Sequence, residues 1–177
     1  VTISFIPQPV AGTSGTLNVC SNSAPVALAT GLGGTPDAGG TWTLLGSGVA
    51  AMYDPATQAS GVYVYTVTGG VGCTTATANV TVTENAAPNA GVDASTSICA
   101  NGTPVNLFGI LGGTPAAGGT WSGGLIGGMY DPAVNAPGSF VYTVNGTAPC
   151  ANATATITVT EPAPPNAGTD ASVAICA

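Results

Sequence analysis

The chain has 177 residues with no Lys, Arg or His and seven acidic residues, and its formal net charge is −7. The absence of cations excludes a phosphate- or nucleic-acid-binding surface, and no apolar run reaches the roughly 20 residues of a membrane span. The content of 45% hydrophobic residues is sufficient for folded cores, and 27 Gly with 14 Pro favour strands and turns over helices.

The sequence repeats itself with a period of just under 80 residues. Cys20, Cys99 and Cys176 are equivalent positions, spaced 79 and 77 residues apart. This self-similarity predicts an array of similar domains. We assign residues 1–8 to the last strand of a preceding repeat, 9–87 and 88–164 to two whole repeats, and 165–177 to the first strand of a following repeat. The sequence therefore reads as a window from a longer repetitive protein.

Within each repeat the apolar residues alternate with polar ones, which is typical of antiparallel strands with one exposed face. In chain order, a first strand ends at Cys20 or Cys99, a second carries Leu28 or Leu107, and a Gly-rich turn precedes a strand that opens with Trp. Later strands hold a Tyr-rich segment and, in the second repeat, the alternating segment 153–160. The pattern predicts an all-β fold of tandem immunoglobulin-like β-sandwich repeats of about 78 residues. The expected buried residues are Trp42, Trp121, Tyr65, Tyr142, Leu28 and Leu107.

Catalysis is excluded by the available side chains. The seven carboxylates are scattered singly, and no His or Lys is present to activate a nucleophile. The GGTP stretches lack the Lys of a phosphate-binding loop and lead into a strand, so they are turns. We expect no enzyme and no cofactor.

Calcium at the repeat junctions is an open alternative. Glu84 precedes Asp93, and Glu161 precedes Asp170, each pair lying nine residues apart across a Pro-containing linker. Two carboxylates are few for an ion that takes six to eight oxygen ligands, so solvated acids are the simpler interpretation. Asp54 and Asp131, each followed by Pro, are expected to cap turns.

The five cysteines are expected to form structural disulfides in an oxidising, extracellular setting. They are Cys20, Cys73, Cys99, Cys150 and Cys176. We favour bonds within each repeat, Cys20–Cys73 and Cys99–Cys150, because a domain that is duplicated should staple itself. The alternative joins Cys20 to Cys150 of the next repeat. In either case Cys176 finds no partner within residues 1–177.

Several motifs together resemble a known family. They include CANGTPVNL, LGGTPAAGGTWS, YDPA, GSFVYTV and TVTEP in the second repeat, with counterparts in the first. This combination resembles the tandem immunoglobulin- or PKD-like repeats of large Bacteroidota cell-surface adhesins. Such proteins leave the cell by type IX secretion, and many are associated with gliding motility. The resemblance implies an exported protein at the cell surface.

These observations lead to two functional hypotheses. The first is a structural segment of an extracellular adhesin or surface filament, acting as a disulfide-stapled spacer or stalk. Its partners are neighbouring repeats and other copies in a filament, without nucleic acid and without membrane insertion. The alternative is a binding module in which exposed loops, such as residues 43–52, recognise a glycan or a surface.

Overall fold

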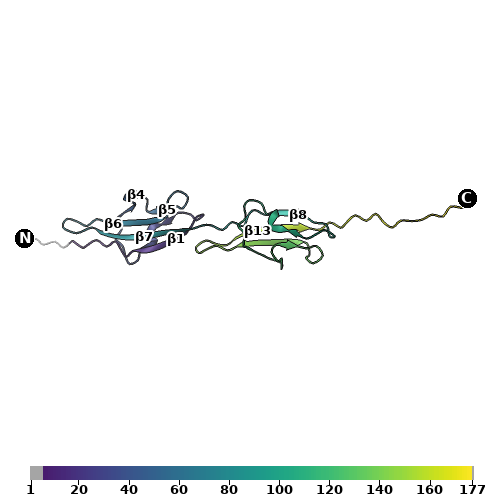
Figure 1. Cartoon of the computed structure of the whole chain (residues 1–177). Coiled ribbons are helices and arrows are strands. Elements are labelled where there is room, and N and C mark those ends of the chain that lie inside the picture. Colours follow the sequence, from purple (N-terminus) through teal and green to yellow (C-terminus); the bar gives the residue numbers. More distant parts are fainter. Residues whose placement is uncertain (1–5, 177) are drawn as a thin grey trace, which may run out of the picture. The chain divides into compact units, whose positions relative to one another are not determined.

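The computed structural model describes residues 6–176, and the chain divides into two compact units (Figure 1). The first unit comprises the described part of Val1–Pro88 together with Asn145–Asn152. The second comprises Asn89–Val144 and the described part of Ala153–Ala177. The segment Asn145–Asn152 lies between two strands of the second unit in sequence, yet it packs with the first unit.

The first unit is a β-sandwich. One sheet has the strand order β1 (Gly15–Cys20), β7 (Ala76–Asn85), β6 (Gly61–Val67), β3 (Thr41–Leu44) and β4 (Ser47–Val49). The second sheet pairs β2 (Val26–Ala27) with β5 (Met52–Tyr53), and a 3₁₀ turn, η1 (Leu28–Gly31), follows β2. All pairings are antiparallel except that of β1 with β7, which is parallel. A first strand that pairs in parallel with the last, beside a small second sheet, is an immunoglobulin-like arrangement.

The second unit repeats this plan with one strand fewer. Its larger sheet has the order β10 (Thr120–Trp121), β12 (Gly138–Val144), β13 (Ala153–Thr160) and β8 (Ala94–Ser97). Its smaller sheet pairs β9 (Val105–Asn106) with β11 (Met129–Tyr130), and η2 (Leu107–Ile110) follows β9. Strand β8 again runs parallel to β13. The all-β, immunoglobulin-like fold predicted from the alternation is confirmed.

Alternation in the sequence sets which face of each strand is buried. On β13, Ala155, Ile157 and Val159 are buried, whereas Thr154, Thr158 and Thr160 are exposed. On β6, Tyr63, Tyr65 and Val67 face the core. Leu28, Leu107, Trp42, Tyr65 and Tyr142 are buried as expected.

Three expectations differ from the structure. The segments that carry Leu28 and Leu107 form strands of only two residues before the chain turns into η1 and η2. Trp121 is half-buried rather than buried, because no counterpart of β4 covers it. Residues 161–176 carry no strand. A first strand of this fold needs the last strand of its own repeat as a partner, and residues 161–176 have none within the described chain.

Of the strand predicted at residues 1–8, residues 1–5 lie outside the described part of the chain. Residues 6–8 have no strand assignment.

Candidate functional site

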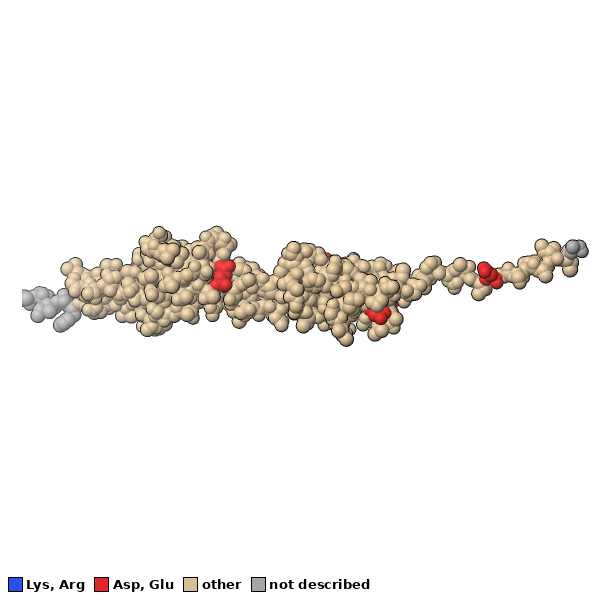
Figure 2. Space-filling view, in the orientation of Figure 1, with Lys and Arg blue, Asp and Glu red and all other residues tan. Residues whose placement is uncertain are grey.

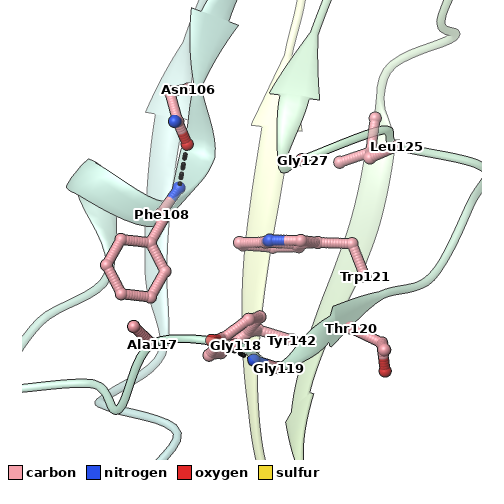
Figure 3. A pocket seen from close by; sticks show the side chains of 10 residues that line it. All are labelled: Asn106, Phe108, Ala117, Gly118, Gly119, Thr120, Trp121, Leu125, Gly127 and Tyr142. Atoms are coloured by element: carbon pink, nitrogen blue, oxygen red, sulfur yellow. Dashed lines mark hydrogen bonds between the residues drawn. The ribbon is translucent and has the colours of Figure 1, made fainter.

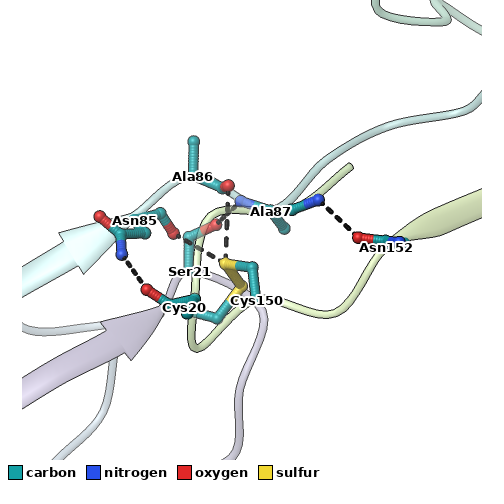
Figure 4. The surroundings of a disulfide bond; sticks show 9 residues. Cys20, Ser21, Asn85, Ala86, Ala87, Cys150 and Asn152 are labelled. Carbon is teal, nitrogen blue, oxygen red and sulfur yellow. Dashed lines mark hydrogen bonds between the residues drawn. A yellow bond between two sulfur atoms is a disulfide. The ribbon is translucent and has the colours of Figure 1, made fainter. Parts of the chain in front are cut away.

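A disulfide bond joins the end of β1 to the segment before β13. The Cα atoms of Cys20 and Cys150 lie 5.0 Å apart, and the two residues are 130 positions apart in sequence. The Sγ atom of Cys150 lies 3.4 Å from the carbonyl oxygen of Asn85 and 3.6 Å from that of Ala86 (Figure 4). The Asn85 side chain donates a hydrogen bond of 2.7 Å to the carbonyl of Ala148. The bond therefore ties the first repeat to a loop that the sequence assigns to the second.

The favoured pairing within each repeat is wrong for Cys20, and strand direction gives the reason. Cys20 lies opposite Asn85 at the far end of β7, because β1 and β7 run parallel. Cys73 lies three residues before β7 begins. The ten residues of β7 span about 33 Å at the rise of an extended strand, and Cα atoms more than about 7 Å apart cannot be bridged. The sequence alternative that joins Cys20 to Cys150 describes the structure.

Cys73 occupies the same surroundings as Cys150, one repeat earlier. Its Sγ atom lies 3.8 Å from the carbonyl oxygen of Ile6 and 4.0 Å from that of Pro7. Ile6 and Pro7 precede Asn85 and Ala86 by 79 residues, which is the spacing of Cys20 and Cys99. Cys73 is nevertheless a free, half-buried thiol.

Two further free cysteines are exposed, Cys99 and Cys176. Cys99 follows β8 as Cys20 follows β1. A disulfide role for Cys73, Cys99 and Cys176 stays a prediction.

The acidic residues that could ligate calcium each accept hydrogen bonds from their own unit. Glu84 accepts a hydrogen bond of 2.8 Å from the Tyr53 hydroxyl, and Glu161 accepts one from Tyr130. Asp93 accepts a hydrogen bond of 2.8 Å from the backbone N–H of Thr156. Residues 6–176 contain no cluster of three or more side chains of the types that ligate metals.

The two Asp-Pro motifs cap turns, as the sequence predicts. Asp54 accepts a hydrogen bond from the backbone N–H of Ala56, and Asp131 accepts one from Ala133. Aspartates used in this way stabilise the turn that leads from one sheet to the other. On the face shown in Figure 2 the acidic side chains lie singly.

The Tyr–Glu contacts change the chemistry of the tyrosines. Burial, and then the hydrogen bond and negative charge of Glu161, raise the pKa of Tyr130 to about 12. The pKa of Tyr53 is raised further, by burial first and then by Glu84. Loss of the phenolic proton is unfavourable where the ring is buried and a carboxylate lies beside it.

We expect the chain to lose stability between about pH 10 and pH 12, because of these tyrosines. Below pH 10 both the folded and the unfolded states hold the phenolic proton. Between the two values the unfolded state releases it while Tyr130 retains it, so unfolding becomes easier as pH rises. Tyr130→Phe should lower the free energy of unfolding at pH 7 by about 1 kcal/mol, through the lost hydrogen bond, and flatten the alkaline decline.

The measurement is urea unfolding followed by tryptophan fluorescence at several pH values. Cys73, Cys99 and Cys176 are changed to Ser throughout, so that thiol ionisation does not contribute. Val134→Ala, at a residue that is 79% exposed, is the control. An alkaline decline of equal slope in Tyr130→Phe and in the control would contradict the assignment.

The chain has low sequence identity to known proteins. No family model matches the chain, and no curated protein matches it. A solved structure of titin domains I67–I69, an E-to-A mutated variant, is similar at 13% identity and a TM-score of 0.48. That match covers 89% of this chain and 66% of the titin chain. Titin domains Z1Z2 in complex with telethonin are similar at 16% identity and a TM-score of 0.27, with 91% and 97% of the two chains covered. The fold assignment rests on the strand topology described above.

Within residues 6–176 no helix is long and apolar enough to cross a membrane.

Proposed function

We propose that the chain is a structural segment of an extracellular, cell-surface adhesin or filament, in which disulfides connect successive repeats. Each unit has its own hydrophobic core and the same strand plan. The bond between Cys20 and Cys150 carries the proposal, because it ties one repeat to the next rather than closing a single domain. Five regularly spaced cysteines support an oxidising location, and the motifs that resemble Bacteroidota surface repeats support export.

The position of this bond defines how the chain bears tension. A force applied to the two ends enters at β1, crosses from Cys20 to Cys150, and leaves through β13. The residues between the two cysteines lie outside this covalent path, so both sandwiches except β1, β13 and the ends are relieved of load. The proposed function is therefore a spacer with limited extensibility.

Single-molecule stretching tests the spacer function directly. The chain is held by its ends and pulled until both units unfold, with and without a phosphine reductant. The 130-residue separation of the cysteines corresponds to about 450 Å of extended chain. The oxidised chain should be shorter than the reduced chain by that length at full extension.

Two variants sharpen the result. Cys20→Ser should stretch like the reduced chain without any reductant. The double variant Cys73→Ser/Cys99→Ser should behave like the oxidised parent, because neither residue is in the bond. Equal extension of the oxidised and reduced parent would overturn the spacer mechanism. Antibody labelling of intact source cells tests the location, and labelling only after lysis would overturn surface display.

A further inference from the structure

The second unit contains an open groove that the spacer function does not use. It has a volume of about 600 Å³ and runs along the free edge of β10. Three aromatic residues form its walls: Trp121 from β10, Tyr142 from β12 and Phe108 from η2 (Figure 3). The ring centroids of Trp121 and Tyr142 lie 5.0 Å apart, and those of Phe108 and Tyr142 lie 5.4 Å apart. Trp121 and Phe108 are only half-buried.

The groove is open because the second repeat lacks a hairpin. In the first unit β3 turns through Leu45 and Gly46 into β4, and Trp42 pairs with Val49. Trp42 is 5% exposed as a result. The corresponding segment 122–129 is two residues shorter and contains four glycines with positive φ, so it forms no strand beside β10. The edge of Trp121 is left accessible.

The first unit shows what the same position looks like when it is closed. Its corresponding hollow has a volume of about 360 Å³ and is lined by Trp42 and Tyr65. Ala29 stands where the second unit has Phe108. The second repeat therefore differs in two ways that act together, since it loses a cover and gains an aromatic wall.

The lining of the groove selects a class of ligand. No charged side chain lines it. Two side-chain N–H groups at the groove, the indole N–H of Trp121 and the amide of Asn106, donate no hydrogen bond to any residue of the range 6–176. The Trp121 nitrogen is also absent from the buried polar atoms without a partner, so solvent reaches it. A ligand that fits is uncharged, has an apolar face and carries hydrogen-bond acceptors.

We propose that this groove binds a pyranose ring of a neutral saccharide chain. The C–H face of a pyranose packs against aromatic rings, and its hydroxyl groups accept hydrogen bonds from N–H donors placed beside them. The net charge of −7 disfavours acidic saccharides. Binding at the second repeat adds an adhesive contact to the spacer and does not depend on the disulfide.

The chain contains only two tryptophans, and this permits a sharp test. An ¹H–¹⁵N spectrum of the intact chain should show one indole signal for Trp42 and one for Trp121, assigned with Trp121→Phe. The chain is titrated separately with cellohexaose, xylohexaose and chitohexaose at millimolar concentrations. At least one of them should shift the Trp121 signal and leave the Trp42 signal in place. A galacturonate fragment of equal length should shift neither.

Two variants separate binding from folding. Phe108→Ala installs the residue that the first repeat has, and it should weaken binding by about tenfold or more. Replacing residues 122–129 with residues 43–52 should close the groove and abolish binding while the melting temperature is retained. The matched control is Ala29→Phe, which should not create a second site because the hairpin still covers Trp42.

Several outcomes overturn the proposal. One is the absence of any Trp121 shift with all three neutral chains. Another is a shift that survives both Phe108→Ala and the loop replacement. Binding of the galacturonate fragment as tightly as the neutral chains would contradict the charge argument.

Discussion

Replacing Cys150 with Ser is expected to lower the free energy of unfolding by about 5 kcal/mol, the largest effect that we expect of any single substitution. The bond closes a loop of 130 residues, and cross-links over loops of that length restrict the unfolded chain most strongly. The segment Asn145–Asn152 should also detach from the first unit, because the disulfide anchors it beside Asn85 and Ala86.

Two measurements check this expectation. Denaturant unfolding gives the loss of stability, and limited digestion with chymotrypsin or Asp-N of native and denatured samples gives the pairing by non-reducing peptide mapping. Cys99→Ser is the matched control, since Cys99 is exposed and free, and it should change the stability by less than about 0.5 kcal/mol. A linked peptide containing Cys20 and Cys73 would contradict the structure.

The second large effect is expected at two equivalent glycines. A Cβ atom on Gly40 would lie 2.5 Å from the Tyr65 ring and 2.7 Å from the carbonyl of Thr66. A Cβ atom on Gly119 would lie 2.5 Å both from the Tyr142 ring and from the carbonyl of Thr143. Each ring also holds the adjacent loop, because Tyr65 and Tyr142 accept hydrogen bonds from Gly40 and Gly119. Gly40→Ala or Gly119→Ala should therefore cost about 1–3 kcal/mol.

Thermal unfolding of each single variant measures the effect. Gly109→Ala is the matched control, because nothing lies within 4 Å of the added Cβ atom and its φ is not positive. It should leave the melting temperature nearly unchanged. Equal melting temperatures for Gly119→Ala and Gly109→Ala would show that the Tyr142 ring yields without cost.

Most of the fold follows from local alternation, and the misjudged parts depend on contacts distant in sequence. The buried faces of β6 and β13 could be predicted because a period of two is a local property. The pairing of Cys20 could not, because it depends on whether β1 runs parallel or antiparallel to β7. The exposure of Trp121 depends on a hairpin that the second repeat lacks.

The role of the glutamates was also missed, although the sequence contained a usable signal. Tyr53 precedes Glu84 by 31 residues, and Tyr130 precedes Glu161 by the same 31. The stretch between Trp and Tyr differs in length by two residues between the repeats, whereas this interval is constant. An interval that is preserved beside one that is not indicates a contact between its ends.

The parallel pairing of β1 also imposes an order of events on a chain that emerges from its N-terminus. Gly15 must wait for Val80 before its strand is completed, and Cys20 must remain a thiol until Cys150 appears 130 residues later. Cys73 and Cys99 appear earlier and compete for Cys20 while the chain is unfolded. Once the first sheet has formed, β7 holds Cys73 at the opposite end from Cys20. Correct oxidation is therefore a matter of timing, in which folding of one repeat precedes the chemistry that joins it to the next.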